Sequence, residues 1–203
     1  TIDQRVTQLT QSPKYDNFPT YSPDGRWLAY ISNRLGFGSL WVQELSSGVE
    51  QQKLALPQRS LLLPDWSPQG DRLLLSAIGI QGYQCFEYQM SNTNYRRIKA
   101  DNRPISNCIY GSQNRIFALD KQAQANGQLL SIGLQGETQV LSSLAMSSIR
   151  VYGENSVLFT RIDKPGLYLL DIESGDYRQL IADLPISYAG HWTLQNDDIY
   201  YYR

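Results

Sequence analysis

The chain has 203 residues, and its 18 Lys and Arg against 19 Asp and Glu give a net charge of −1. This balance excludes a domain that binds nucleic acid through its overall charge, and 41% apolar with only 18% charged residues exclude a disordered chain. No apolar run approaches the ~18 residues of a membrane-spanning helix. The 14 Tyr, 15 Gly and 9 Pro favour strands and turns over helices.

A segment of roughly 42 residues recurs along the chain. In its two clearest copies, Phe18–Gly25 and Leu63–Gly70, a Ser-Pro-x-Gly turn precedes an apolar run. These runs, with three weaker copies, begin at Leu28, Leu73, Ile116, Val157 and Ile199, in steps of 45, 43, 41 and 42 residues. Such a period matches the roughly 40–45 residues of a four-stranded propeller blade.

Each copy divides into four expected strands: a short first strand, the apolar run, a second apolar or aromatic strand, and a polar outer strand. In the turn after the first strand, proline presets φ and glycine takes the positive φ that the turn requires. We therefore predict an all-β chain, with residues 1–203 forming a single β-propeller domain. The predicted blades are 17–56, 61–100, 104–141 and 147–182, with an outer strand at 4–10 and a partial blade at 188–203.

The last copy supplies only the first two strands of a blade. Its aromatic run at Ile199–Tyr202 carries little charge to block pairing with a foreign strand. We expect the native protein to continue past Arg203. We also expect the edge of Asp198–Arg203 to pair with the N-terminal strand, a neighbouring chain or further residues.

The run Tyr21–Arg34, followed by Leu40-Trp41 and Ser47-Gly48, resembles the TolB-type propeller repeat. The second copy departs from the repeat at Gln69, and the last three copies keep only its hydrophobic pattern. Proteins with this repeat include periplasmic transport accessories, peptidases and sensors. The resemblance therefore implies the fold more specifically than the function.

The C-terminal copies are similar to the last blades of CadC-type membrane-bound transcription factors. The similar residues are Gly166–Gly175, Leu180, Gly190–Trp192 and Ile199–Tyr202. Such regulators combine a cytoplasmic winged helix that binds DNA, one membrane helix and a periplasmic C-terminal domain. The resemblance implies a non-catalytic sensor propeller on the periplasmic side of the inner membrane, whose winged helix and anchor are absent from these 203 residues.

Two other functions stay open. The first is a TolB-like envelope module that docks another protein, and the second is the propeller of a prolyl oligopeptidase-like peptidase. The peptidase would need a nucleophile elbow beyond residue 203. For a sensor or a docking module, we expect a protein partner or a small-molecule signal at a propeller face, no direct contact with nucleic acid, and self-association through the open edge as a further outcome.

The sequence lacks a recognisable catalytic or metal-binding set. His191 is its single histidine, and neither Cys-x-x-Cys, His-Glu-x-x-His nor Gly-x-Ser-x-Gly occurs. We therefore expect no enzymatic activity, no metal and no cofactor. Scattered carboxylates leave a glycosidase as a minor alternative, but we align Asp171 with Glu44 and Glu87 and interpret it as a structural repeat position.

One position of the first strand supplies the candidate ligand-facing residues: Thr20, Asp65, Arg150 and His191, with Cys108 in the third copy. Polar groups there would face the central channel and bind a ligand or sense pH. The alternative for His191 is a hydrogen-bonded residue at a strand end. The basic cluster Tyr95–Lys99 is typical of an outer strand that charge protects against foreign pairing.

The two cysteines allow two interpretations. Cys85 occupies a slot that other copies fill with leucine, which is typical of a small apolar filler. Cys108 lies in the first strand of the next copy. An oxidising compartment would permit a disulfide between Cys85 and Cys108 if their Cα atoms came within about 7 Å.

Overall fold

The computed structural model describes residues 8–10, 12–112, 115–122, 126–185, 192–195 and 198–201. Every regular element in this part of the chain is a β-strand. The strands form four antiparallel sheets of four strands each, followed by a sheet of two strands. Within the same residues, no helix has the length and apolar character needed to cross a membrane.

The four sheets follow one another in chain order. Blade 1 contains β1 (Asp16–Tyr21), β2 (Trp27–Ser32), β3 (Ser39–Glu44) and β4 (Glu50–Leu54). Blade 2 contains β5 (Arg59–Trp66), β6 (Arg72–Gly79), β7 (Gly82–Gln89) and β8 (Tyr95–Arg97). Blade 3 contains β9 (Ile105–Tyr110), β10 (Ile116–Asp120), β11 (Leu129–Ile132) and β12 (Thr138–Ser142). Blade 4 contains β13 (Met146–Tyr152), β14 (Ser156–Arg161), β15 (Leu167–Asp171) and β16 (Tyr177–Ile181).

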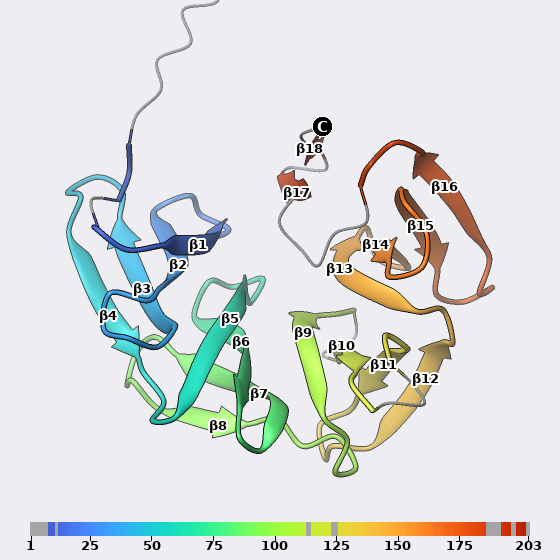
Figure 1. Ribbon diagram of the computed structural model, residues 1–203, viewed down its shortest axis with the longest axis horizontal. Helices are drawn as coiled ribbons and strands as arrows, with labels where there is room; N and C mark the ends of the chain where they lie inside the picture. The colour runs from blue at the N-terminus through green and yellow to red at the C-terminus, as the bar shows by residue number, and fades with distance from the viewer. Residues whose placement is uncertain are drawn as a thin grey trace, which may run out of the picture.

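The blades are arranged around an arc, with β1, β5, β9 and β13 inside and β4, β8, β12 and β16 outside (Figure 1). The two-stranded sheet of β17 (Trp192–Gln195) and β18 (Asp198–Tyr201) lies in the opening between blades 1 and 4. Among the described strands, β18 pairs with β17 alone. The prediction of an all-β propeller is confirmed, with four complete blades.

The hydrophobic core lies between consecutive blades rather than inside one sheet. One buried cluster joins blades 1 and 2, a second joins blades 2 and 3, and a third joins blades 3 and 4. A fourth cluster packs Trp192 of β17 against Leu158 and Leu167 of blade 4. The second strand of a blade is covered on both faces, which explains why β2, β6 and β14 contain continuous apolar runs.

The Ser-Pro-x-Gly turns adopt the conformation that their residues predict. In blade 1 the Ser22 hydroxyl accepts a hydrogen bond of 2.9 Å from the Trp27 N–H, and Gly25 has a φ of 69°. In blade 2 Ser67 accepts a bond of 3.0 Å from the Arg72 N–H, and Gly70 has a φ of 71°. The serine thus fixes the start of the second strand in both copies.

The predicted outer strand at 4–10 is not found in the part that the structure describes. Residues 8–10 form no strand, and residues 4–7 lie outside the described residues. The segment nevertheless contacts blade 1, because the Gln43 side-chain amide donates a hydrogen bond of 3.0 Å to the Leu9 carbonyl.

Candidate binding groove between blades 2 and 3

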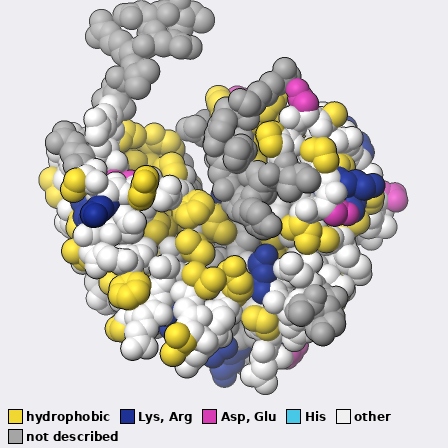
Figure 2. Space-filling model, in the orientation of Figure 1, with side chains coloured by type: hydrophobic (Ala, Val, Ile, Leu, Met, Phe, Trp, Pro, Cys, Tyr) yellow, Lys and Arg dark blue, Asp and Glu magenta, His cyan; other side chains and the backbone are white. Residues whose placement is uncertain are grey.

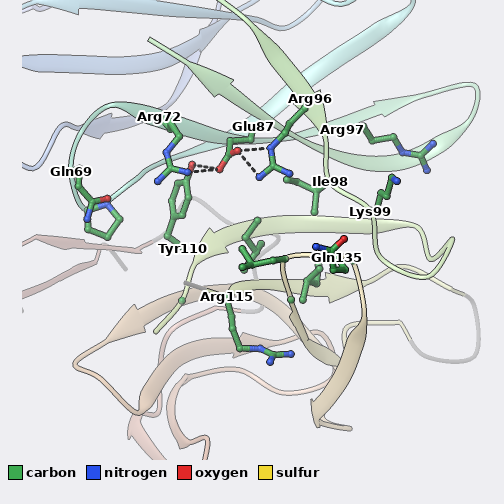
Figure 3. A pocket seen from close by; sticks show the side chains of 17 residues that line it. Gln69, Arg72, Glu87, Arg96, Arg97, Ile98, Lys99, Tyr110, Arg115 and Gln135 are labelled. Carbon is green, nitrogen blue, oxygen red and sulfur yellow. Dashed lines mark hydrogen bonds and ion pairs between the residues drawn. The ribbon is translucent and has the colours of Figure 1, made fainter. Parts of the chain in front are cut away.

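A groove of about 560 Å³ lies between blades 2 and 3. Five basic side chains and one carboxylate line it, together with Tyr110 and the turn between β11 and β12: Arg72, Arg96, Arg97, Lys99, Arg115 and Glu87 (Figure 3). Figure 2 shows Lys and Arg side chains gathered at the lower rim of the view, over the junction of these two blades. The groove is therefore strongly cationic on a chain whose net charge is −1.

Glu87 is the central anchor of this groove. Its side chain, on β7, is 8% exposed. One carboxylate oxygen accepts a hydrogen bond of 3.1 Å from the Tyr110 hydroxyl and lies 3.4 Å from Arg72, while the other accepts one of 2.7 Å from Arg96. Burial, and then the adjacent Glu87 carboxylate, raise the pKa of Tyr110, so its hydroxyl remains a donor. This one carboxylate links both walls of the groove.

Strand register shows why the sequence did not reveal Glu87. Glu87 pairs with Leu74 on β6, and the corresponding residues of the other three blades are Val42, Ser131 and Leu169. The alignment of Asp171 with Glu87 is wrong, because Asp171 pairs with Ser156 and corresponds to Glu44 and Gln89. Glu87 could have been singled out from the sequence as a carboxylate at a repeat position where the other blades have uncharged residues.

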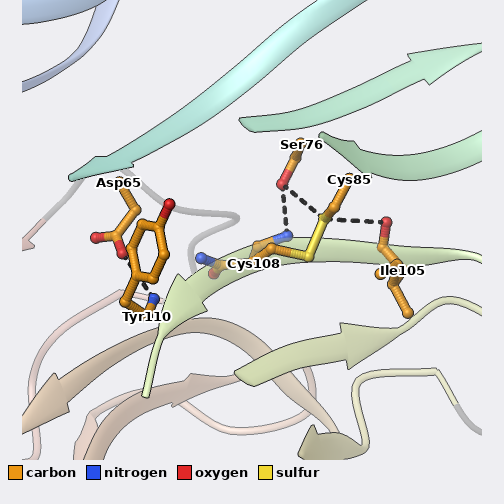
Figure 4. Close-up of a disulfide and its surroundings, with 7 residues drawn as sticks. Asp65, Ser76, Cys85, Ile105, Cys108 and Tyr110 are labelled. Atoms are coloured by element: carbon orange, nitrogen blue, oxygen red, sulfur yellow. Dashed lines mark hydrogen bonds between the residues drawn. A yellow bond between two sulfur atoms is a disulfide. The ribbon is translucent and has the colours of Figure 1, made fainter. Parts of the chain in front are cut away.

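A disulfide joins the two walls next to Glu87. Cys85 of β7 and Cys108 of β9 are bonded, with their Cα atoms 6.4 Å apart, and both are fully buried (Figure 4). The cysteines precede Glu87 and Tyr110 by two residues on the same strands. Ser76 reinforces the junction, because its hydroxyl accepts a hydrogen bond of 2.7 Å from the Asn107 N–H. Blade 2 and strand β9 are thus fixed to each other by covalent and polar contacts.

The basic cluster Tyr95–Lys99 has a second role beside the predicted one. Its first three residues form the exposed outer strand β8, as expected. Arg96, Arg97 and Lys99 also line the groove. These residues both protect the sheet edge and line the groove because the turn between β11 and β12 packs against the end of β8. A Cβ atom on Gly136 of this turn would lie 2.6 Å from the Cβ atom of Lys99.

Only some of the candidate ligand-facing residues occupy the same register position of the first strand. Thr20, Asp65 and Arg150 pair with corresponding residues of β2, β6 and β14. In β9 this position belongs to Ile109, so its assignment to Cys108 is wrong. Five residues separate Tyr110 from Ile116, one fewer than separate Trp66 from Leu73, and this shorter turn shifts the register. His191 lies outside the described residues.

Asp65 makes a contact between blades rather than an open ligand site. Its Oδ2 accepts a hydrogen bond of 2.9 Å from the Tyr110 N–H. Burial raises the pKa of Asp65 to about 6, although Arg150 and the Tyr110 N–H oppose the shift. Burial also lowers the pKa of Arg150, whose Nη1 donates a hydrogen bond of 2.8 Å to the Ile149 carbonyl. Thr20 contributes its carbonyl, which accepts a hydrogen bond of 3.1 Å from the Trp66 indole.

A metal-binding arrangement does not occur in the described part of the chain. No group of three or more His, Cys, Asp or Glu side chains lies close enough there to hold an ion. The groove instead offers guanidinium and ammonium donors, which are suited to bind carboxylate or phosphate oxygens.

Replacing Glu87 with glutamine is expected to lower the free energy of unfolding by about 1–3 kcal/mol, because hydrogen bonds to charged groups in a buried site are lost. Partial exposure of Arg72 and Arg96 keeps the loss below that of a fully buried ion pair. Urea denaturation of the purified wild type and variant measures this loss in the free energy of unfolding. Glu154→Gln, at an exposed turn, is the control and should change stability by less than about 0.5 kcal/mol. Equal losses in both variants would contradict the anchoring role.

Comparisons with known proteins support the TolB-type resemblance. No family model matches the chain. A stretch of 73 residues is 36% identical to the Tol-Pal system protein TolB of Alcanivorax borkumensis; it covers 36% of this chain and 17% of that protein. The crystal structure of TolB from Acinetobacter baumannii superimposes with a TM-score of 0.73 at 16% identity, over 88% of this chain and 46% of that one.

Part of a peptidase structure is also similar in fold. The puromycin-hydrolyzing peptidase of Mycobacterium tuberculosis gives a TM-score of 0.65 at 13% identity, over 88% of this chain and 30% of that one. The chain therefore spans less than half the length of each of these proteins. At such identities the structural likeness shows the fold, and the CadC-type resemblance receives no support from it. This chain has the fold of a TolB-like β-propeller.

Proposed function

We propose that this chain is a non-catalytic, protein-binding propeller of the bacterial envelope. The observation that carries the proposal is the cationic groove whose two walls are joined by Glu87 and by a disulfide. A preorganised surface of this kind lowers the cost of ordering side chains when a partner binds. The likeness in fold and partial sequence to TolB, a protein named for the Tol-Pal system, supports the same function.

The proposed location is outside the cytoplasm, in the periplasm. Disulfides persist in oxidising compartments such as the periplasm and are rare in the cytosol. The bond between Cys85 and Cys108 supports this location, because it joins two blades in the buried core.

Two narrower functions are distinguished by the sequence outside these 203 residues. The similarity of Gly166–Gly175 to CadC-type regulators motivates a sensor role, which requires a winged helix and a membrane span encoded upstream. The propeller of the mycobacterial peptidase motivates a peptidase role, which requires a nucleophile elbow in the same reading frame. The complete gene sequence decides both, and neither feature is needed for protein binding.

Site-specific photo-crosslinking in cells of the native host tests the proposed function. The photoreactive benzoylphenylalanine replaces Leu134, a groove-lining residue of the β11–β12 turn that is 79% exposed. The control position is Val49, which is 52% exposed near the corresponding turn of blade 1. We expect a light-dependent protein adduct of defined mass from position 134 and none from position 49. No adduct at 134, or the same adducts at both positions, would contradict the proposal.

A further inference from the structure

We propose that the groove between blades 2 and 3 binds an extended, carboxylate-rich segment of a partner protein. This inference deepens the proposed function and rests on it. The partner's chemistry follows from three features of the groove: which of its charges are already compensated, the hollow that continues from it, and the free backbone edge beside it.

The cations of the groove differ in how far they are compensated. Glu87 forms ion pairs with Arg72 and Arg96 and also accepts a hydrogen bond from the Tyr110 hydroxyl. No ion pair between described residues involves Arg97, Lys99 or Arg115. Arg115 donates a hydrogen bond from Nε to the Ser131 hydroxyl. Three positive side chains therefore line the groove without a carboxylate partner among the described residues, and an acidic ligand would supply the missing negative charge.

The groove continues beyond its main hollow. A second hollow of about 460 Å³ shares Arg97, Lys99 and Gln135 with the first and extends past them to residues 100–102. Gly136 holds the turn of blade 3 close to Lys99, so the two hollows follow the junction of blades 2 and 3. A channel that follows a blade junction suits an extended chain better than a compact ligand.

The outer edge of blade 2 offers free backbone groups beside the groove and the second hollow. The Ile98 N–H bonds to the Cys85 carbonyl and the Gln89 N–H to the Asn94 carbonyl, so Arg96 is the residue whose backbone pairs with Glu87. Hydrogen bonding alternates along an antiparallel pair, and the N–H and C=O of Arg97 therefore point away from β7. Since β8 is the last strand of its sheet, an extended segment can pair with this edge.

A peptide fits these features better than a nucleic acid. Binding of single strands relies on exposed aromatic faces on which bases stack. Tyr110 is the aromatic residue of the groove, and its hydroxyl is bound to Glu87 while the Arg72 guanidinium lies 5.8 Å from its ring centre. Carboxylates on alternate residues of a strand lie on one face of it, so several of them can meet the cations that line the groove on that side.

Fluorescence anisotropy with the purified chain tests the inference. The probes are a fluorescein-labelled peptide of alternating Glu and Val, the same peptide with Gln in place of Glu, and a labelled oligothymidylate of equal length. We expect the Glu peptide to bind at least tenfold more tightly than the Gln peptide at low salt, and more tightly than the oligothymidylate. Equal binding of the two peptides, or stronger binding of the oligothymidylate, would overturn the inference.

Charge variants locate the binding. Lys99→Glu with Arg115→Glu is expected to weaken binding of the Glu peptide at least tenfold. Lys53→Glu with Arg178→Glu makes the same charge change on the outer strands of blades 1 and 4 and should stay within twofold. Equal weakening in both double variants would refute the assigned groove. If the groove variant fails to fold, Lys99→Gln with Arg115→Gln makes the same comparison against Lys53→Gln with Arg178→Gln.

The two proposals can fail separately. A persisting crosslink from position 134 without selectivity for carboxylates overturns the acidic ligand and leaves protein binding intact. Selective, groove-dependent binding of the Glu peptide without a crosslink overturns the protein partner in the cell and leaves the groove's preference for carboxylates.

Discussion

Replacing Cys85 and Cys108 together with alanine is expected to lower the free energy of unfolding by about 3 kcal/mol. The bond links residues 23 positions apart, and cross-linking a loop of this size restricts the unfolded chain by about that amount. Both side chains are fully buried between blades 2 and 3, so the substitutions also remove packing at the base of the groove.

Urea denaturation of the oxidised wild type, the reduced wild type and the double variant measures this loss. The reduced wild type is the control, because it keeps both sulfur atoms and lacks only the bond. Alkylation after unfolding, followed by mass measurement, should find no reactive thiol without reductant and two with it. Two alkylated thiols without reductant, or equal stability of oxidised and reduced protein, would contradict the prediction.

Replacing Asp65 with asparagine is expected to raise the free energy of unfolding relative to the wild type by about 2–3 kcal/mol more at pH 7 than at pH 4. The pKa of Asp65 is about 6 in the folded chain, against about 3.9 for an unfolded aspartate. Between these values the folded state holds a proton that the unfolded state releases. The contribution of Asp65 to stability therefore falls as pH rises from about 4 to 6 and stays low above that range.

Thermal or urea unfolding of both proteins from pH 4 to pH 7 measures this difference. Asp24, Asp71 and Asp171 have lowered pKa values and contribute the opposite slope, but they are common to both proteins and cancel in the comparison. Asp65→Ala is the control for the hydrogen bond, because it leaves the Tyr110 N–H without its acceptor. A difference between wild type and Asp65→Asn that does not change with pH would contradict the raised pKa.

The repeat and the fold could both be predicted from local features of the amino-acid sequence. The apolar runs at Leu28, Leu73, Ile116, Val157 and Ile199 lie on the second strand of each successive sheet. The turns at Ser22 and Ser67 form as their residues predict. These features could be predicted because strand propensity, turn geometry and the spacing of buried residues depend on neighbours in the chain.

The candidate site could not be predicted in this way, because its residues meet across blade junctions. Glu87 meets Tyr110 across a blade junction, and Asp65 reaches the N–H of the same residue from another strand. The bond between Cys85 and Cys108, which the sequence left open, depends on the same approach of β7 to β9. The turn before Ile116 is one residue shorter than the turn before Leu73, and the position of Asp65 therefore falls on Ile109 in β9 rather than on Cys108. Contacts between blades depend on register and packing of distant segments, and the repeat period does not determine either to within a single residue.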